Sequence, residues 1–491
     1  MKNSDSYEIV IGLEVHAQLL TSSKLFCGDS IAFGENPNTN ISPITLAHPG
    51  TLPRMNKKAI GLAIKLGLAC HAEIMKENYF ARKNYFYPDL PKGYQVSQHT
   101  TPICKGGFIK IKTGDGEKKI QLNRIHMEED AGKSLHDVYT NESALDFNRA
   151  GTALVEIVTE PVLRSGDEAH AYLTALRKMV RYLDVCDGNM EEGSFRCDAN
   201  ISVRKKARPT GSSGRGETKL GTKVEVKNLN SIRNVKRAIE HEGERMIDML
   251  ENSQVITQQT RGFDANTGAT FEIREKEDAD DYRYFPEPDL TPFNITGDFI
   301  NTIKNEIPAL QEERIEKYRS LYQLSEFDAL ALTDEKEFAD YFEQAVQLTG
   351  NYKAVANWML GPVKTWLNES NKEIKEFPLS AASLVNLIVL VEENILSFSS
   401  ASAKVFPLMT EDPVADAMKL ATALNLIQES NIDYILPITD EVLLHFTDKV
   451  KEYKKGKKGL LALFVGEVMK RSKGKADPKK VNEIILEKLK Q

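Results

Sequence analysis

A carboxylate and an imidazole interrupt an apolar segment close to the start of the chain. Residues 9–19 are mostly aliphatic, and Glu14 and His16 stand two positions apart within them. Alternate residues of a strand point to the same face, so one sheet would present the two side chains together. The pair is either a salt bridge on a half-exposed strand or part of a site for a hard cation with phosphate.

Further strand-like segments carry polar side chains that face one way. They are the segment ending in Glu128, Glu129 and Asp130, that containing Glu156, that containing Arg196, Asp198 and Asn200, and that containing Glu225 and Lys227. One such strand is usually a solvated sheet face. When most strands of one domain share this pattern, it indicates a concave polar sheet. Its carboxylates would hold Mg²⁺, and its Lys and Arg side chains would hold phosphates.

The nucleotide site predicted from these residues is not of a common loop type. The sequence contains no Walker loop, Rossmann fingerprint or kinase glycine loop. Residues 81–95 interleave aromatic rings, prolines and bases without a regular period. This segment is either an ordered surface loop held by its rings or a binding loop carried by the scaffold.

Composition places the chain among globular proteins of several domains. It has 491 residues, of which 27% are charged and 8% aromatic, enough for two to four domains. The start lacks an apolar signal core, and no apolar run is long enough to span a bilayer. The five cysteines form no CxxC pair. We therefore expect a cytoplasmic protein with reduced thiols and no membrane partner.

Charge is distributed unevenly along the chain. Residues 449–491 hold 14 Lys/Arg against 5 Asp/Glu, a net charge of +9. The whole chain carries −7, so the remainder carries −7 − 9 = −16. An acidic body with a basic tail indicates a separate role for the tail, and a local cationic surface fits a polyanion.

Six motifs resemble, in order, those of the B subunit (GatB type) of the bacterial tRNA-dependent amidotransferase. They are residues 11–16, 84–95, 124–133, 192–200, 224–231 and 281–290. The lysine-rich end also resembles the tail of this family. The resemblance implies an α+β fold, with a catalytic cradle of the glutamine synthetase/guanido kinase type over residues 1–294. Its sheet would be mixed and largely antiparallel. A helical domain over 295–408 and a basic helical, tRNA-binding tail over 409–491 would follow.

The resemblance also implies a reaction. The chain would use ATP and Mg²⁺ to phosphorylate the side-chain carboxylate of Glu on tRNA(Gln), of Asp on tRNA(Asn), or of both. Ammonia from a partner A subunit, a glutaminase of the amidase type, would then displace the phosphate, and a small C subunit would complete a heterotrimer. Two alternatives stay open: a non-catalytic tRNA-binding scaffold, and a free-standing ligase of the glutamine synthetase kind.

Roles follow from the resemblance by position. It implies metal ligation by Glu14, His16, Glu129 and Glu156, contacts to nucleotide by Lys83, Asn84, Arg196, Asp198, Asn200 and Lys227, and catalytic roles for Glu14, Glu129 and Lys227. Many members of the family bind zinc through four cysteines in the first loop. Here Cys27 remains, with Asp29, Ser42 and Thr45 at the other positions. A single thiolate cannot make a tetrahedral sulfur site, so no structural zinc is expected.

Overall fold

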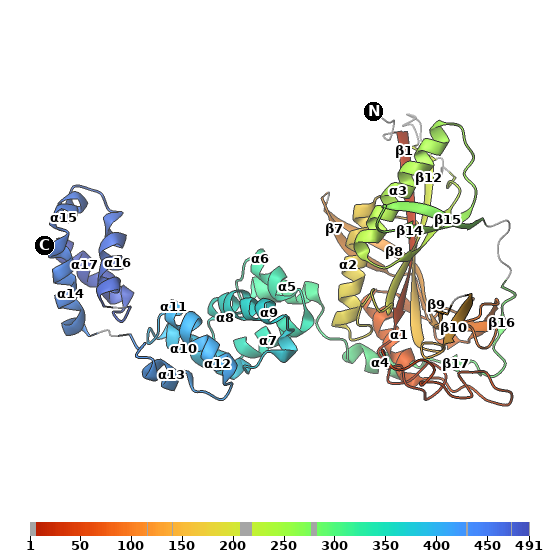
Figure 1. The fold of residues 1–491 in the computed structure, drawn as a ribbon, viewed down its shortest axis with the longest axis horizontal. Coiled ribbons are helices and arrows are strands. Elements are labelled where there is room, and N and C mark those ends of the chain that lie inside the picture. Colours follow the sequence, from red (N-terminus) through yellow and green to blue (C-terminus); the bar gives the residue numbers. More distant parts are fainter. Residues whose placement is uncertain are drawn as a thin grey trace. The chain divides into compact units, whose positions relative to one another are not determined.

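The computed structural model describes residues 6–490 except 115, 140, 207–218, 276–281, 429–430 and 473. The chain divides into two compact units, Met1–Leu310 and Gln311–Gln491. The first combines a large sheet with helices, and the described part of the second is helical (Figure 1). The α+β class expected from the sequence is confirmed at this level.

The sheet of the first unit is built around its first strand. Strand β1 (Tyr7–Gln18) pairs antiparallel with β11 (Ala153–Thr159) on one side and with β12 (Phe195–Lys205) on the other. The sheet continues from β11 through β8 (Gly116–Glu129), β5 (Tyr94–Ser97) and β4 (Ala81–Asn84) to β16 (Phe285–Pro286). From β12 it continues through β13 (Val224–Leu229) and β14 (Gln259–Asp264) to β15 (Ala269–Glu275). The β13–β14 pair is parallel, so the sheet is mixed and mainly antiparallel.

Shorter strands border this sheet. They are β2 (Glu73–Ile74), β3 (Glu77–Asn78), β6 (Cys104–Lys105), β7 (Phe108–Thr113), β9 (Lys133–Tyr139), β10 (Glu142–Asp146) and β17 (Phe293–Asn294). Strands β7 and β8 form an antiparallel hairpin. Residues 81–95, expected to be irregular throughout, contain two short paired strands: β4 and the start of β5. Only the loop between them is irregular.

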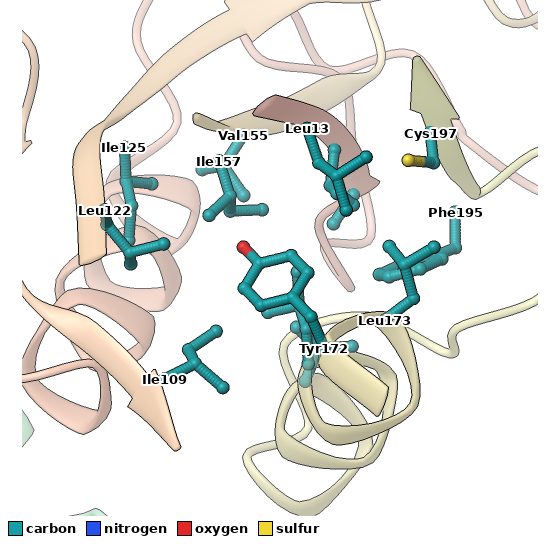
Figure 2. Close-up of a cluster of buried hydrophobic side chains, with 14 of the residues drawn as sticks. Leu13, Ile109, Leu122, Ile125, Val155, Ile157, Tyr172, Leu173, Phe195 and Cys197 are labelled. Atoms are coloured by element: carbon teal, nitrogen blue, oxygen red, sulfur yellow. The ribbon is translucent and has the colours of Figure 1, made fainter. Parts of the chain in front are cut away.

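One face of the sheet is apolar because every second residue of its central strands is aliphatic. Figure 2 shows Leu13 of β1 and Val155 of β11 among the side chains packed around Tyr172 and Leu173 of the next helix. That helix is α2 (Gly166–Tyr182), and α1 (Lys57–Ala69) and α3 (Ile232–Glu251) complete this layer of the core. Their N-caps are Ser165, Asn56 and Ser231, whose side chains accept hydrogen bonds from the first turns.

The second unit contains two separate hydrophobic cores. The first is formed by α5 (Gln311–Ser320), α6 (Glu326–Leu332), α7 (Lys336–Val346), α8 (Tyr352–Trp358), α9 (Lys364–Ser370), α10 (Ala381–Glu392), α11 (Phe398–Ser400), α12 (Phe406–Glu411) and α13 (Ala417–Ala423) with short irregular helical turns. The second is formed by α14 (Ile432–His445), α15 (Thr447–Lys454), α16 (Leu460–Arg471) and α17 (Pro478–Lys490). None of the helices in the described ranges has the length and apolar character of a membrane span.

The observed boundaries differ from the expected ones at 294/295 and 408/409. Helix α4 (Gly297–Asn305) belongs to the first unit, because Ile303 joins the core beneath α1. Position 408 lies within α12, whose Phe406 and Met409 are buried in the first helical core. The change of core occurs later, between Ala421 and Ile435.

A left-handed glycine at the base of the β7 strand gives the first prediction. Gly107 has φ +92°, and an added Cβ would lie 2.5 Å from the carbonyl oxygen of Cys70. Gly107→Ala should therefore destabilise the first unit by about 2–4 kcal/mol, through backbone strain and a forced shift of Cys70. Thermal unfolding of the full chain measures the effect. Gly28→Ala, with open space around the added methyl, is the control, and equal midpoints for the two variants would contradict the prediction.

Candidate functional site

A row of ionisable side chains crosses the face of the sheet opposite the helices. In the strand register, His126 of β8 lies opposite Glu156 of β11, and Glu156 lies opposite His16 of β1. His16 in turn lies opposite Arg196 of β12. The apolar face of the same strands fixes this arrangement, because a shift by one residue would exchange the two faces.

Three donor groups converge in the middle of this row. The Nε2 atom of His16 is 3.5 Å from Oε1 of Glu128 and 3.5 Å from Oε2 of Glu156. One donor atom from each of these residues lies within 4.8 Å of the other two. Two carboxylates with one imidazole form a donor set suited to a divalent cation such as Mg²⁺ or Mn²⁺. The residues therefore fit a metal site.

His126 supports the same carboxylates from the side. Its Nε2 atom lies 3.2 Å from Glu156 and 3.7 Å from Glu128. Burial alone would lower the pKa of His126, but the two carboxylates outweigh burial and raise it to about 9. The imidazoles in turn lower the pKa of Glu156 well below its usual value despite burial. Both acids are thus held ionised in the interior.

Glu14 lies beside this group rather than in it. Its Oε1 accepts a hydrogen bond of 2.9 Å from the side-chain amide of Asn200. Burial raises the pKa of Glu14, and the negative charges of Glu156 and Glu225 raise it further. Among the described atoms, the side-chain oxygen of Asn200 is buried without a hydrogen-bond partner.

A lysine bridges two acids at the β12–β13 end of the row. The Nζ atom of Lys227 is 3.0 Å from Asp198 and 3.0 Å from Glu225. Burial lowers the pKa of Lys227, but these carboxylates outweigh burial and raise it above its usual value. Lys227 therefore stays charged, on the same face as the acids of β1.

Asp130 positions the arginine of the row. Its Oδ2 accepts hydrogen bonds of 2.7 Å from Arg196 Nη2 and 2.7 Å from Gln18 Nε2. Burial raises the pKa of Asp130, but Arg196 and Arg149 outweigh burial and lower it. In the described structure Arg196 Nε is buried without a partner. The arginine is thus held at one end while another donor stays uncommitted.

The structure does not place Glu129 with the predicted metal ligands. Its carboxylate lies on the other face of β8, where it pairs with Lys92 and accepts a 2.9 Å hydrogen bond from the Val96 amide. Its neighbour Glu128 takes the place beside His16 instead. Glu128, His126 and Asp130 were not among the site residues predicted from the sequence. The sequence does hold a signal for them. Ile125 and Met127 are both buried in the core, so strand alternation places residues 126 and 128 on the polar face.

Lys83 and Asn84 are placed differently from each other. Lys83 Nζ lies 5.5 Å from the ring centre of Tyr85 and 4.9 Å from that of Tyr282. Burial lowers the pKa of Lys83, but negative groups led by Glu128 raise it overall. The side-chain amide of Asn84 donates a 2.8 Å hydrogen bond to the Arg283 carbonyl. Asn84 thus anchors a backbone segment, whereas it was expected to contact nucleotide.

Comparison with known proteins agrees with these motifs. Residues 9–301 match the model described as the GatB/GatE catalytic domain, and residues 340–489 match the GatB domain. Proteins named as the B subunit of aspartyl/glutamyl-tRNA(Asn/Gln) amidotransferase are similar over nearly their whole length. That of Thermodesulfovibrio yellowstonii is 46% identical over 99% of this chain and 100% of its own, and that of Geobacter sulfurreducens is 47% identical over the same shares. The chain belongs to the GatB family.

Cys27, Asp29 and Thr45 of the first loop form a polar group. Thr45 Oγ1 donates to the carboxylate of Asp29 and lies 3.4 Å from Cys27 Sγ. The buried ammonium of Lys24 lies 3.4 Å from the same hydroxyl and donates a 2.8 Å hydrogen bond to the Asn40 carbonyl. Burial raises the pKa of the Cys27 thiol. A neutral thiol beside an ammonium is a poor zinc site, so the absence of structural zinc remains our prediction.

Replacing Glu128 and Glu129 one at a time tests which of these two neighbours on β8 binds metal. We expect Glu128→Gln to weaken the binding of Mn²⁺ or Mg²⁺ to the full chain by at least about tenfold, because a ligand charge is lost. Glu129→Gln is the matched control and should leave metal affinity nearly unchanged, since its carboxylate faces Lys92. Titration of free Mn²⁺ by electron paramagnetic resonance measures both. A larger loss in Glu129→Gln would restore the assignment made from the sequence.

Proposed function

We propose that this chain is the subunit of a tRNA-dependent amidotransferase that activates the amino acid. It would transfer the γ-phosphoryl group of ATP to the side-chain carboxylate of Glu on tRNA(Gln), of Asp on tRNA(Asn), or of both. The observation that carries the proposal is the group of His16, Glu128 and Glu156, set between the cationic side chains of Arg196 and Lys83. Membership of the GatB family supports the same reaction.

The reaction needs an activated acyl group because a carboxylate is a poor electrophile. A carboxylate oxygen bonds to the γ-phosphorus as the bond to the bridging oxygen breaks, and ADP leaves. Ammonia then bonds to the carbonyl carbon, phosphate leaves with the electron pair of the C–O bond, and the nitrogen gives up a proton. Both steps depend on charge stabilisation and alignment more than on a covalent role for the protein.

The polar face supplies groups suited to these tasks. His16, Glu128 and Glu156 would hold Mg²⁺, whose charge stabilises the phosphates when it is bound. Arg196 and Lys227 are cations held in place by carboxylates, and would bind phosphate oxygens. Glu14 has a raised pKa and is suited to take up the proton that the nitrogen releases. Asp198 and Asn200 would position Lys227 and Glu14.

The helical region that ends the chain supplies a surface for tRNA. The six lysines between Lys449 and Lys458 are all exposed, and so are Lys470 and Arg471. They surround the small core in which Phe464 and Val468 of α16 are buried. A folded cationic surface on an acidic chain would contact mainly the phosphates of the tRNA and would recognise its shape rather than its bases. The ammonia would come from a glutaminase A subunit, braced by a small C subunit.

The two alternatives account for less of the structure. A scaffold that only binds tRNA has no use for two buried carboxylates held ionised beside His16. A free-standing ligase for small molecules has no use for the exposed lysines of α15 (Thr447–Lys454) and the turn after it. The combination of both features favours the amidotransferase subunit.

Removal of the bridging lysine tests the chemistry. In the assembled complex, Lys227→Met should lower ATP-dependent amide formation by about 100-fold or more, because the positive charge that would stabilise the phosphates is lost. Glutamine hydrolysis by the partner subunit, measured without tRNA, should stay near wild type. Lys236→Met, on α3 and paired with Asp167, is the control. Wild-type formation of Gln-tRNA or Asn-tRNA by Lys227→Met would remove this residue from the reaction.

Neutralisation of the tail lysines tests tRNA binding. Changing Lys454, Lys455, Lys457 and Lys458 to Gln should weaken binding of tRNA to the complex. It should also reduce the slope of log affinity against log salt by about 0.7–0.9 for each phosphate that is no longer neutralised. The matched control changes to Gln four exposed lysines on the helical region around the first helical core: Lys364, Lys372, Lys404 and Lys419. Equal slopes for both sets would leave the tail as a solubility feature.

A further inference from the structure

One row of residues runs straight across the polar face from the centre of the sheet to the β15 end. In the strand register, Glu14 of β1 lies opposite Asp198 of β12. Asp198 pairs with Lys227 of β13 at 3.0 Å, and Lys227 lies opposite Gly262 of β14. Gly262 in turn lies opposite Phe271 of β15, the strand at this end of the sheet. The proposed reaction uses the row only as far as Lys227.

The outer end of the row is a ring laid across a glycine. A Cβ added at Gly262 would lie only 2.4 Å from Cζ of Phe271, and 2.8 and 2.9 Å from its two Cε atoms. Any side chain at position 262 would therefore displace the ring. Phe271 is nevertheless 51% exposed. The ring thus covers the backbone of β14 on one side and is open to solvent on the other.

Strand alternation places this ring on the polar face. Residues opposite each other on neighbouring strands project to the same side of a sheet, so Phe271 shares the side of Lys227. Arg261, next to Gly262, projects to the other side, where its Nε atom lies 3.3 Å from the Glu242 carboxylate of α3. The ring therefore stands on the surface that carries the acids and cations, not on the surface that packs against the helices.

Folding alone does not account for an open apolar surface at this place. Phe271 and its neighbour Ile273 are 51% and 48% exposed, and neither belongs to the core formed by the described residues of the first unit. Covering a glycine stabilises a strand pair, but only the inner side of the ring is needed for that. The outer side remains available to a flat apolar group, whose contact with the ring would remove both from water.

The neighbours of the ring indicate what kind of group this is. The core of a protein–protein interface is depleted in charged residues, whereas this ring adjoins Lys227 and, through it, Asp198 and Glu14. A ring next to a fixed cation matches a nucleotide, whose base stacks while its phosphates pair with the positive charge.

The width of the sheet also suits a nucleoside triphosphate. Neighbouring strands are about 4.8 Å apart, so Gly262 of β14 lies about 10 Å across the sheet from β12 and about 14 Å from β1. A γ-phosphate beside Arg196 of β12 and the metal-binding group would leave the other phosphates passing Lys227. An extended ribose then brings the base over β14, where the Phe271 ring lies.

We propose that the Phe271 ring, laid across Gly262, is the platform on which the base of ATP stacks. The ribose lies between the ring and Lys227, and the phosphates are directed toward Arg196 and the metal-binding group. This inference rests on the proposed function for the identity of the nucleotide. It adds an apolar contact for the base, separate from the charges that hold the phosphates.

The experiment compares ATP with ribose 5-triphosphate, which has the same phosphates and sugar but no base. Isothermal titration calorimetry measures the binding of each to the full chain in the presence of Mg²⁺. We expect the wild type to bind ATP about tenfold more tightly, within the range for base–aromatic stacking. Phe271→Leu still covers Gly262 with an apolar side chain. It should abolish the advantage of ATP while leaving the affinity for ribose 5-triphosphate unchanged.

Further variants separate stacking from a general loss of structure. Phe271→Trp should keep the advantage of ATP, because a π face remains. Gly262→Val should lose it, because the added side chain occupies the place of the ring. Phe33→Leu, at a ring that is 72% exposed elsewhere in the first unit, is the matched control and should keep it.

Two results would overturn the inference. One is an unchanged advantage of ATP in Phe271→Leu, and the other is equal affinity of the wild type for both ligands. If Phe271→Leu kept the advantage but failed to assemble with its protein partners, the ring would be part of a protein interface instead.

Failure of the platform can be distinguished from failure of the proposed function. If ribose 5-triphosphate binds and the base adds nothing, only the platform is wrong. If neither ligand binds, the proposed use of ATP is wrong as well. Amide formation by the complex adds a second readout: Phe271→Leu should raise KM for ATP by about tenfold, with kcat at saturating ATP near wild type.

Discussion

Two like charges buried side by side impose the main constraint on the first unit. Glu128 and Glu156 are almost inaccessible to solvent, and burial opposes the ionisation of both. They stay ionised because His126 and His16 lie within 3.2–3.7 Å on adjoining strands. A divalent cation would provide the same compensation with more charge. A metal ion bound there would displace the proton of His16, so its binding would be coupled to proton release.

The sheet can carry these charges because its other face is a core. The aliphatic residues that alternate with the acids on β1, β8, β11 and β12 pack against α2 around Tyr172 (Figure 2). Their burial fixes the strand register, and the register fixes which acid faces which imidazole. A change that weakens the apolar side is thus expected to misalign the polar side, although no atom of the site is altered.

Local sequence signals predicted the central strands of the first unit. Polar residues set into aliphatic segments indicated the strands β1, β11 and β12. The errors arose where contacts distant in sequence decide the outcome. Glu129 was assigned as a ligand by position from the family resemblance, and only the register of β8 against β11 distinguishes it from Glu128. Strand β4 has four residues, too few for a period, and one of its two partners, β16, lies far along the chain. Helix α4 likewise packs against α1 in the core of the first unit, although the helix that follows it in sequence, α5, belongs to the second unit.

Charge is distributed differently over residues 449–491 and over the rest of the chain. Excluding residues 449–491, the protein has a net charge of −16, and the polar face of the sheet gathers carboxylates such as Glu128, Glu156 and Asp198. Such a surface repels a polyanion over a distance set by the ionic strength. Cations fixed on the same face reduce this repulsion locally, because Arg196 and Lys227 are each held beside carboxylates and present positive charge to an approaching anion.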